Sequence, residues 1–152
     1  MDLIKVNEEF LIQINIARAQ KVFGFAMSLN FPLDAIEIIQ SNGVPDIIMG
    51  DFLGERAQVF PNLSINTTNN VGTLLIGYSQ EGGAPEKSGD GHMLSIKAKA
   101  LKEGEHSLVW SANSTVKDSN LQVQSCSFED LVFRVDKNNP GVNVVTINIA
   151  KP

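Results

Sequence analysis

Within the segment Val22–Phe31, the nine residues from Phe23 to Phe31 alternate between large and small side chains. The large ones are Phe23, Phe25, Met27, Leu29 and Phe31, and the small ones are Gly24, Ala26, Ser28 and Asn30. A repeat of two residues places successive side chains on opposite faces of a strand, so this segment predicts a β-strand with one buried face. The other face has only small, uncharged side chains, where a solvated strand face usually carries Lys, Glu or Thr. We infer that it is shaped for contact with something other than water.

Further strand patterns recur along the chain, separated by clusters rich in Gly, Asn, Asp and Ser. The predicted strands are Phe10–Ile16, Gly72–Tyr78, His92–Leu101, Ser107–Trp110, Leu121–Val123, Leu131–Val135 and Val142–Ile149. Many short strands with turn signals between them favour an all-β sandwich or barrel. Only Pro32–Ile39 suggests one or two helical turns, and its second half, Ala35–Ile39, fits a short strand equally well.

Composition limits the class of protein. The chain has 152 residues, of which 43% are hydrophobic and 19% charged, so we expect one globular domain over residues 1–152. The net charge of −5, with no basic stripe, argues against nucleic acid as a partner. No apolar run approaches the roughly 20 residues of a membrane span. Because the first residues lack the pattern of a signal peptide, we expect a domain from a longer secreted or cell-surface protein.

Residues that could carry catalysis or hold a metal are scattered. His92 and His106 have no second His or Cys at metal-ligand spacing, and the lone Cys126 excludes an internal disulfide and a thiolate cluster. The Gly-rich loop before His92 lacks the ordered ligands of a calcium loop. Adjacent acidic residues such as Glu8 and Glu9 would point to opposite faces of a strand. We therefore expect no enzyme activity, no bound metal and no cofactor.

The order of these segments resembles the cohesin family, whose modules hold dockerin-bearing proteins on scaffolds such as cellulosomes. The resemblance rests on five stretches: Gly24–Phe31 followed by Ala35–Ile39, then Gly72–Ile76, Gly89–Ala100, Val116–Asn120 and Gly141–Val144. It extends over nearly the whole chain and implies a nine-stranded sandwich of jelly-roll topology. It also implies a dockerin-bearing partner, calcium on that partner rather than on this domain, an extracellular or cell-surface location, and contact with polysaccharide only through other proteins.

The resemblance places partner-binding residues at outward positions of the strands that match Val22–Asn30, Gly72–Ser79 and Met93–Lys99. These residues are Ala26, Ser28, Asn30, Thr73, Leu75, Gly77, Ser79, Met93, Ser95 and Lys97. Leu75 and Met93 are expected to be exposed among them, as suits an interface poor in charge and rich in Met.

The chain departs from the family at several points. Phe31-Pro32-Leu33 stands where the family has Tyr-Asp-Pro, and a strand before Ile4 looks short or missing. Gly24 and Ala26 stand where well-studied cellulosomal cohesins carry Asn and Asp. This difference argues against the dockerins of those cohesins as partners and leaves room for a more hydrophobic interface.

Three alternatives stay open at this point. Another segment of the chain, such as Ser125–Val135, would cover the small-residue face and make it core. A carbohydrate-binding module shares the sandwich architecture, and Tyr78 and Trp110 are the aromatic candidates for a sugar platform. A structural or adhesive module of a surface protein would have no separable ligand.

Overall fold

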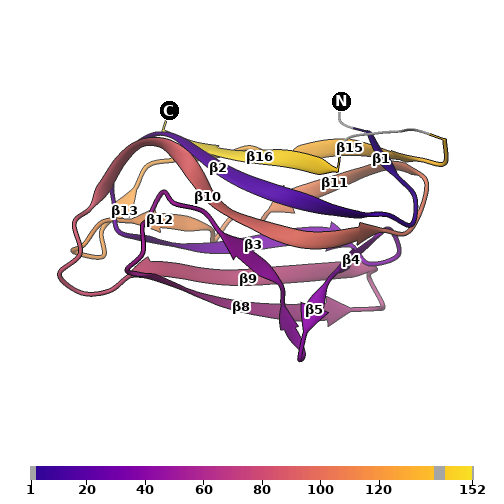
Figure 1. The fold of residues 1–152 in the computed structure, drawn as a ribbon, viewed down its shortest axis with the longest axis horizontal. Coiled ribbons are helices and arrows are strands. Elements are labelled where there is room, and N and C mark those ends of the chain that lie inside the picture. Colours follow the sequence, from indigo (N-terminus) through magenta and orange to yellow (C-terminus); the bar gives the residue numbers. More distant parts are fainter. Residues whose placement is uncertain (1–2, 139–142, 152) are drawn as a thin grey trace.

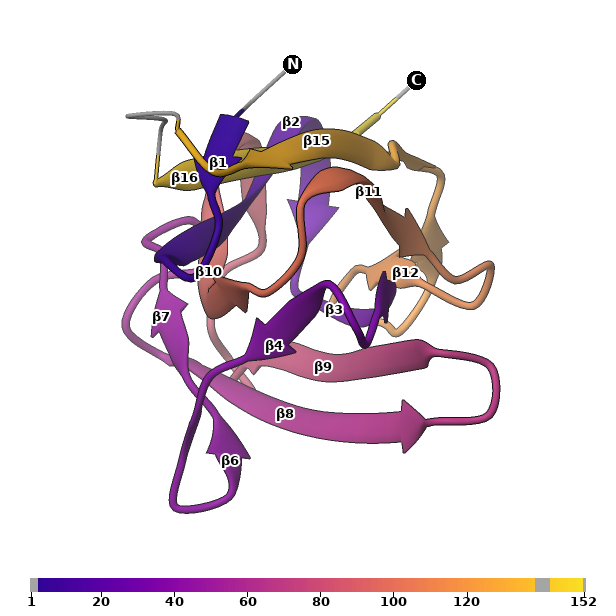
Figure 2. The same cartoon turned by 90° about the vertical axis from the view of Figure 1, so that its right-hand side faces the viewer.

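Two β-sheets face each other in the computed structural model, which describes residues 3–138 and 143–151 (Figures 1 and 2). The larger sheet contains β1 (Leu3–Lys5), β3 (Gly24–Pro32), β8 (Ala57–Asn66), β9 (Val71–Gln80), β11 (Gly104–Trp110), β12 (Thr115–Lys117), β13 (Val123–Gln124) and β15 (Leu131–Asp136). The smaller sheet contains β2 (Glu9–Val22), β4 (Ile36–Ile38), β7 (Ile47–Met49), β10 (Lys87–Ala100), β14 (Ser127–Phe128) and β16 (Val144–Ala150). A separate hairpin of β5 (Gln40–Ser41) and β6 (Val44–Pro45) projects beside β8.

The all-β sandwich of jelly-roll type is confirmed. The described residues form sixteen strand segments, many of only two or three residues, rather than nine continuous strands. The described residues contain no helix, and so none that is long and apolar enough to cross a membrane. Helical turns over Pro32–Ile39 are therefore wrong, and the short-strand alternative is correct, since β4 pairs with β10.

The other predicted strands fall on observed ones, with shifted ends. The strand predicted over Val22–Phe31 is interrupted at Phe23, which separates β2 from β3. The first strand, which looked short or missing from the sequence, is the three-residue β1, which pairs in parallel with β15. Of the closing segment, Gly141 and Val142 lie outside the described residues.

Strand β3 lies at the centre of the larger sheet and is hydrogen-bonded on both edges. It pairs with β9 on one side and with β11 and β12 on the other. Phe25, Met27, Leu29 and Phe31 all point into the core and are 4% exposed or less. They join one hydrophobic cluster that also contains the inward isoleucines of β2 and β10, so the alternation in the sequence is satisfied by burial between the sheets.

Strand β8 forms the edge of the larger sheet and pairs only with β9. The sequence pattern did not predict it. Proline at position 61 lowers strand propensity, but proline is tolerated on an edge strand because the missing N–H faces no neighbour. The Ala57 N–H bonds to the Gly54 carbonyl at 3.4 Å rather than to β9, which places odd-numbered backbone groups of β8 on the free edge.

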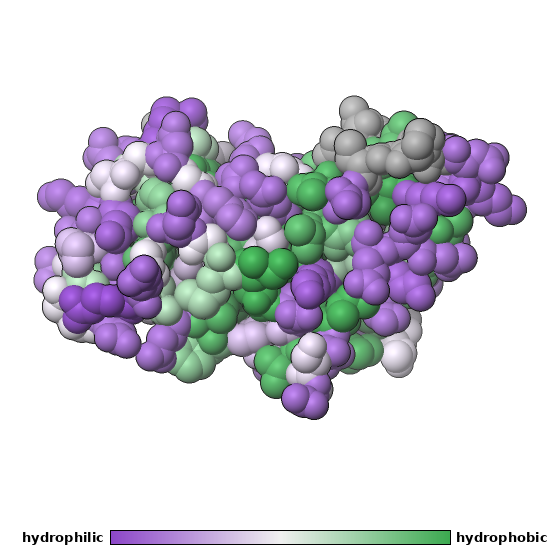
Figure 3. Space-filling view, viewed as in Figure 1, coloured by the Kyte–Doolittle hydropathy of each residue, from purple (hydrophilic) through white to green (hydrophobic). Residues whose placement is uncertain are grey.

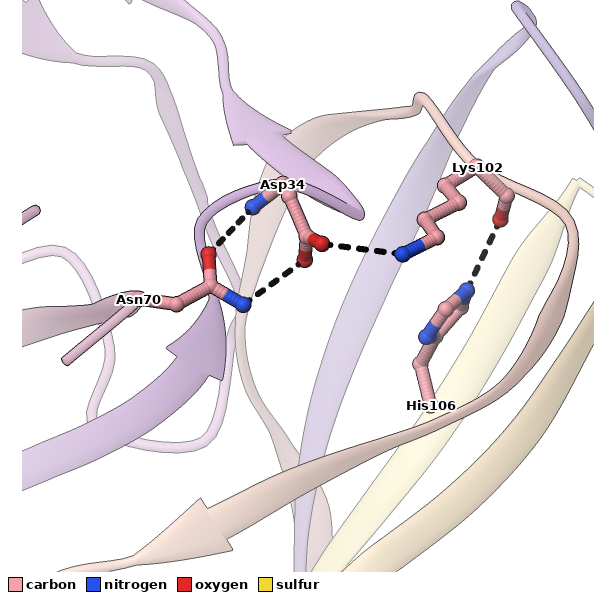
Figure 4. Close-up of polar contacts among 4 residues, drawn as sticks. All are labelled: Asp34, Asn70, Lys102 and His106. Carbon is pink, nitrogen blue, oxygen red and sulfur yellow. Dashed lines mark hydrogen bonds and ion pairs between the residues drawn. The ribbon is translucent and has the colours of Figure 1, made fainter.

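Polar side chains connect three turns at one end of the sandwich (Figure 4). The Asn70 side chain, in the β8–β9 turn, accepts a bond from the Asp34 backbone N–H and donates one to the Asp34 carboxylate, both at 2.9 Å. The Lys102 ammonium donates to the same carboxylate at 3.0 Å, and the Lys102 carbonyl accepts a bond from His106 Nε2 at 2.8 Å. The β8–β9 hairpin is thereby fixed to the rest of the domain.

The hydrogen bonds from Asn70 and Lys102 lower the pKa of the Asp34 carboxyl below its ordinary value. A lowered pKa in the folded state means that the stabilisation is present above the unfolded-state pKa of about 4 and is lost as the pH falls through the folded-state pKa. We expect the Asp34→Asn variant to be less stable than wild type at pH 7, with the difference vanishing in acid. Denaturant titrations of both proteins between pH 7 and pH 2 measure it. A difference that stays constant with pH would contradict this role for the carboxylate.

Candidate functional site

The outward side chains of three neighbouring strands, β8, β9 and β3, form one surface, which we call the neutral face. It consists of Gln58, Phe60, Asn62, Ser64 and Asn66 from β8, Val71, Thr73, Leu75, Gly77 and Ser79 from β9, and Gly24, Ala26, Ser28, Asn30 and Pro32 from β3. None of these fifteen residues is charged. The strand register places them in cross-strand rows.

The middle row of the neutral face combines a large aromatic with a low floor. Phe60, Gly77 and Ala26 lie opposite one another on β8, β9 and β3, and Phe60 is 66% exposed. A Cβ added to Gly77 would meet no atom within 4 Å, so the space above it is open. In the next row Leu75 lies between Asn62 and Ser28 and is 39% exposed. The surface is therefore apolar at its centre, with Phe60 projecting beside a low area at Gly77 and Ala26.

Two hydroxyls on the neutral face already have hydrogen-bond partners in the domain. The Thr73 hydroxyl donates to the Asn30 side-chain oxygen at 2.6 Å. The Ser79 hydroxyl donates to the Gln80 carbonyl at 3.2 Å. A partner that covers these groups leaves their internal hydrogen bonds intact, so burying them is less costly than burying free hydroxyls.

Seven of the predicted partner-binding residues lie on β3 and β9, and six of them reach the surface. Ala26, Leu75 and Ser79 are exposed, and Asn30, Thr73 and Gly77 are partly exposed. Ser28 is the exception at 5% exposed.

The connection between β11 and β12 explains the burial of Ser28. The Ser114 hydroxyl accepts the Ser28 backbone N–H at 3.0 Å and lies 3.3 Å from the Ser28 carbonyl, to which it also donates. The Ser111 backbone N–H bonds to that carbonyl at 2.8 Å. The expectation that Ser28 faces solvent is wrong, since Ser28 is 5% exposed. Residues 111–114 take the place of a neighbouring strand beside it.

The three predicted residues on β10 do not join the neutral face, because β10 belongs to the opposite sheet. Met93 is fully buried, at 0% exposed. The register with β2 shifts between His92 and Leu94, so Met93 is the extra residue of a β-bulge and the alternation breaks there. Ser95 is also buried, and its hydroxyl lies 2.8 Å from His92 Nε2. Lys97 pairs with Asp46 at 3.3 Å. The expected exposure of Met93 is wrong.

Two exposed apolar regions of this side escaped prediction from the sequence. One is Phe60 on β8. The only sequence pattern that could have indicated this strand is the weak alternation of Ala57, Val59, Leu63 and Ile65 around Phe60. The other is Val123 on β13, which lies opposite Lys117 of β12 and is 62% exposed.

The segment Ser125–Val135 does not cover the neutral face. Its β14 pairs with β16 in the smaller sheet, and its β15 pairs with β11 in the plane of the larger sheet. The alternative that this segment turns the neutral face into core is therefore wrong.

The aromatic candidates for a sugar platform are buried. Tyr78 is 1% exposed, its hydroxyl lies 3.4 Å from the Gly50 carbonyl, and burial raises its pKa. Trp110 is 8% exposed and donates its indole N–H to the Glu129 carbonyl at 2.9 Å. Among the described residues no group of three or more His, Cys, Asp or Glu side chains could hold a metal ion.

The outer face of the smaller sheet has a different character. Figure 3 shows this side of the molecule, where hydrophilic residues gather toward both ends and hydrophobic ones lie between them. Glu9, Glu37, Lys97 and Lys99 stand at outward positions of its strands. Ile48 of β7 is an exposed apolar residue here, at 42%, and offers a control for substitutions on the neutral face.

The fold is that of cohesin domains. It superimposes on the type II cohesin dyad of the adaptor scaffoldin ScaA from Acetivibrio cellulolyticus with a TM-score of 0.70 and 16% identity, covering 90% of this chain and 46% of that one. A non-cellulosomal cohesin from the archaeon Archaeoglobus fulgidus gives 0.59 and 12% identity over 99% of this chain and 86% of that one. A type I cohesin–dockerin complex from Clostridium thermocellum gives 0.62 and 10% identity over 89% of this chain and 94% of that one. No protein-family model and no curated protein sequence matches the chain.

Substitutions of two neighbouring leucines on β9 test which side of the sheet faces solvent. Leu75 is 39% exposed and Leu74 is 0% exposed. We expect Leu75→Asp to change the free energy of unfolding by about 1 kcal/mol or less, because the carboxylate stays hydrated. Leu74→Asp buries an unpaired charge and is expected to cost more than about 4 kcal/mol or to prevent folding. Denaturant titration measures both. Similar losses for the two variants would show that the outer side of β9 is covered.

Proposed function

We propose that this chain is a non-catalytic recognition module that binds a dockerin-type helical partner on the neutral face. The observation that carries the proposal is the outward side of β8, β9 and β3, which holds fifteen residues without a charge. Interface cores are depleted in charged residues, whereas solvated surfaces are rich in them. The cohesin fold supports the choice of partner, since structural neighbours include cohesin–dockerin complexes.

The dimensions of the neutral face suit a helix. Ten residues of β9 extend about 33 Å, which is the length of a helix of about 20 residues. Adjacent strands are about 4.8 Å apart, so the three strands together match the 10–12 Å width of one helix with its side chains. Small residues at Gly77 and Ala26 let a helix approach closely, and Phe60 and Leu75 supply apolar anchors of the kind that dominate binding energy.

The same proposal places the domain in an extracellular or cell-surface scaffold, as one module of a longer protein. Calcium belongs to the dockerin partner, and polysaccharide is reached only through proteins that the partner carries. Neither nucleic acid nor membrane insertion has a part in it.

Isothermal titration of the 152-residue chain with calcium-loaded dockerins from the same genome tests the function. We expect at least one dockerin to bind with 1:1 stoichiometry, and Leu75→Asp to abolish that binding while the protein stays folded. The matched control, Ile48→Asp, puts the same charge at an equally exposed apolar position of the opposite sheet and is expected to bind normally. Failure of every dockerin to bind would overturn the proposal, as would equal binding by Leu75→Asp.

A substitution at Gly77 is expected to change stability and binding in opposite directions. Because nothing lies within 4 Å of an added Cβ, Gly77→Thr fits without a clash, and replacing a strand glycine by a β-branched residue is expected to stabilise by about 0.5–1 kcal/mol. The new side chain would stand on the floor between Phe60 and Ala26. We expect a higher melting temperature and at least tenfold weaker dockerin binding. Unchanged affinity would mean that the partner does not approach this part of the face.

A further inference from the structure

A cavity of about 180 Å³ lies at the end of the neutral face where β3 begins and β9 ends. It is lined by Phe23, Gly24, Phe25, Ser79, Lys117, Asp118 and Leu121. Lys117 is on β12, directly opposite Gly24, with Val123 of β13 opposite it on the other side. The cavity thus combines apolar walls with the Lys117 ammonium group and the Asp118 carboxylate.

Lys117 is the only charged residue at the outward positions of β8, β9, β3, β12 and β13. It is partly buried. Within the ranges 3–138 and 143–151, no carboxylate forms an ion pair with it at 4.0 Å or less.

Asp118 is the acidic residue nearest to Lys117 in the sequence. Its carboxylate oxygens accept hydrogen bonds from residues that follow it in the chain. One of its carboxylate oxygens accepts the backbone N–H groups of Asn120 and Gln122, both at 2.9 Å, and the other accepts the Gln124 side chain at 3.2 Å. These bonds organise the turn that follows β12, in which Leu121 adopts a φ of 63°. Three N–H donors thus hold the Asp118 carboxylate in the turn, and it forms no ion pair with Lys117 at 4.0 Å or less although both side chains line the cavity. The Lys117 ammonium therefore has room for a carboxylate of a partner.

We propose that Lys117 binds a carboxylate of the docked partner and thereby fixes which way round the partner lies. This inference rests on the proposed function. The apolar centre of the neutral face favours contact with a partner but does little to determine the orientation in which the partner docks. A partner docked with its carboxylate over the cavity gains a charge-assisted hydrogen bond, whereas one docked in the reverse orientation covers the Lys117 ammonium without pairing it, which is costly.

Surface plasmon resonance with the dockerin that binds wild type tests the inference. We expect Lys117→Met to weaken binding severalfold and Lys117→Glu to weaken it by at least tenfold, with the association rate losing part of its salt dependence. Lys137→Glu, an exposed charge reversal after β15, is the control and is expected to leave the dissociation constant within about twofold of wild type. Thermal melts confirm that each variant is folded.

The outcomes distinguish this inference from the proposed function. If Leu75→Asp abolishes binding but Lys117→Glu leaves the dissociation constant within about twofold of wild type, the role of Lys117 is overturned and the docking face stands. If Lys117→Glu and Lys137→Glu weaken binding equally, the effect is one of overall charge and the specific role is again overturned. If wild type binds no dockerin, both proposals fall.

Discussion

Burial of the four large inward side chains of β3 is the constraint on which the rest of the structure depends. β3 pairs with β9 without interruption from Gly24 opposite Ser79 to Pro32 opposite Val71. A slip of one residue would turn Phe25, Met27, Leu29 and Phe31 to solvent, since side chains alternate with a period of two. The hydrophobic core therefore holds the register, and the register in turn decides which residues of β9 and β8 stand on the neutral face.

Under the proposed function, one set of strands serves both stability, with its inward side chains, and recognition, with its outward ones. The inward side chains of β3 and β9 make the core, and the outward ones are free to be small and uncharged because they add little to folding. Strand β8 extends the surface, and Pro61 leaves its free edge without one N–H donor, which disfavours the addition of another strand. The face of the sheet is therefore a better binding surface than its edge. Lys117 gives this otherwise uniform face a direction.

Alternation in the sequence was sufficient to predict β3 and β9 and to place Ala26, Leu75, Gly77 and Ser79 outward. The same rule correctly placed Leu94, Ile96, Ala98 and Ala100 of β10 on the buried side. It failed at Met93, because a bulge there shifts the alternation and no composition signal marks that residue as extra. It failed for Ser28 because Ser114, 86 positions away, occupies the edge of β3 at that point. Strand β8 was missed because proline weakens the local pattern, although at an edge it is harmless.

The sequence alone determined that the chain is all-β, and which face of its regular strands is apolar, because the period of two is a property of the backbone itself. The tertiary structure decided which strands are neighbours. It put β8 beside β9, moved β10 to the opposite sheet, and brought the cavity at Lys117 to the end of the neutral face. Which strands are neighbours depends on hydrogen bonds and packing between residues far apart in the chain. Local side-chain patterns do not specify these contacts.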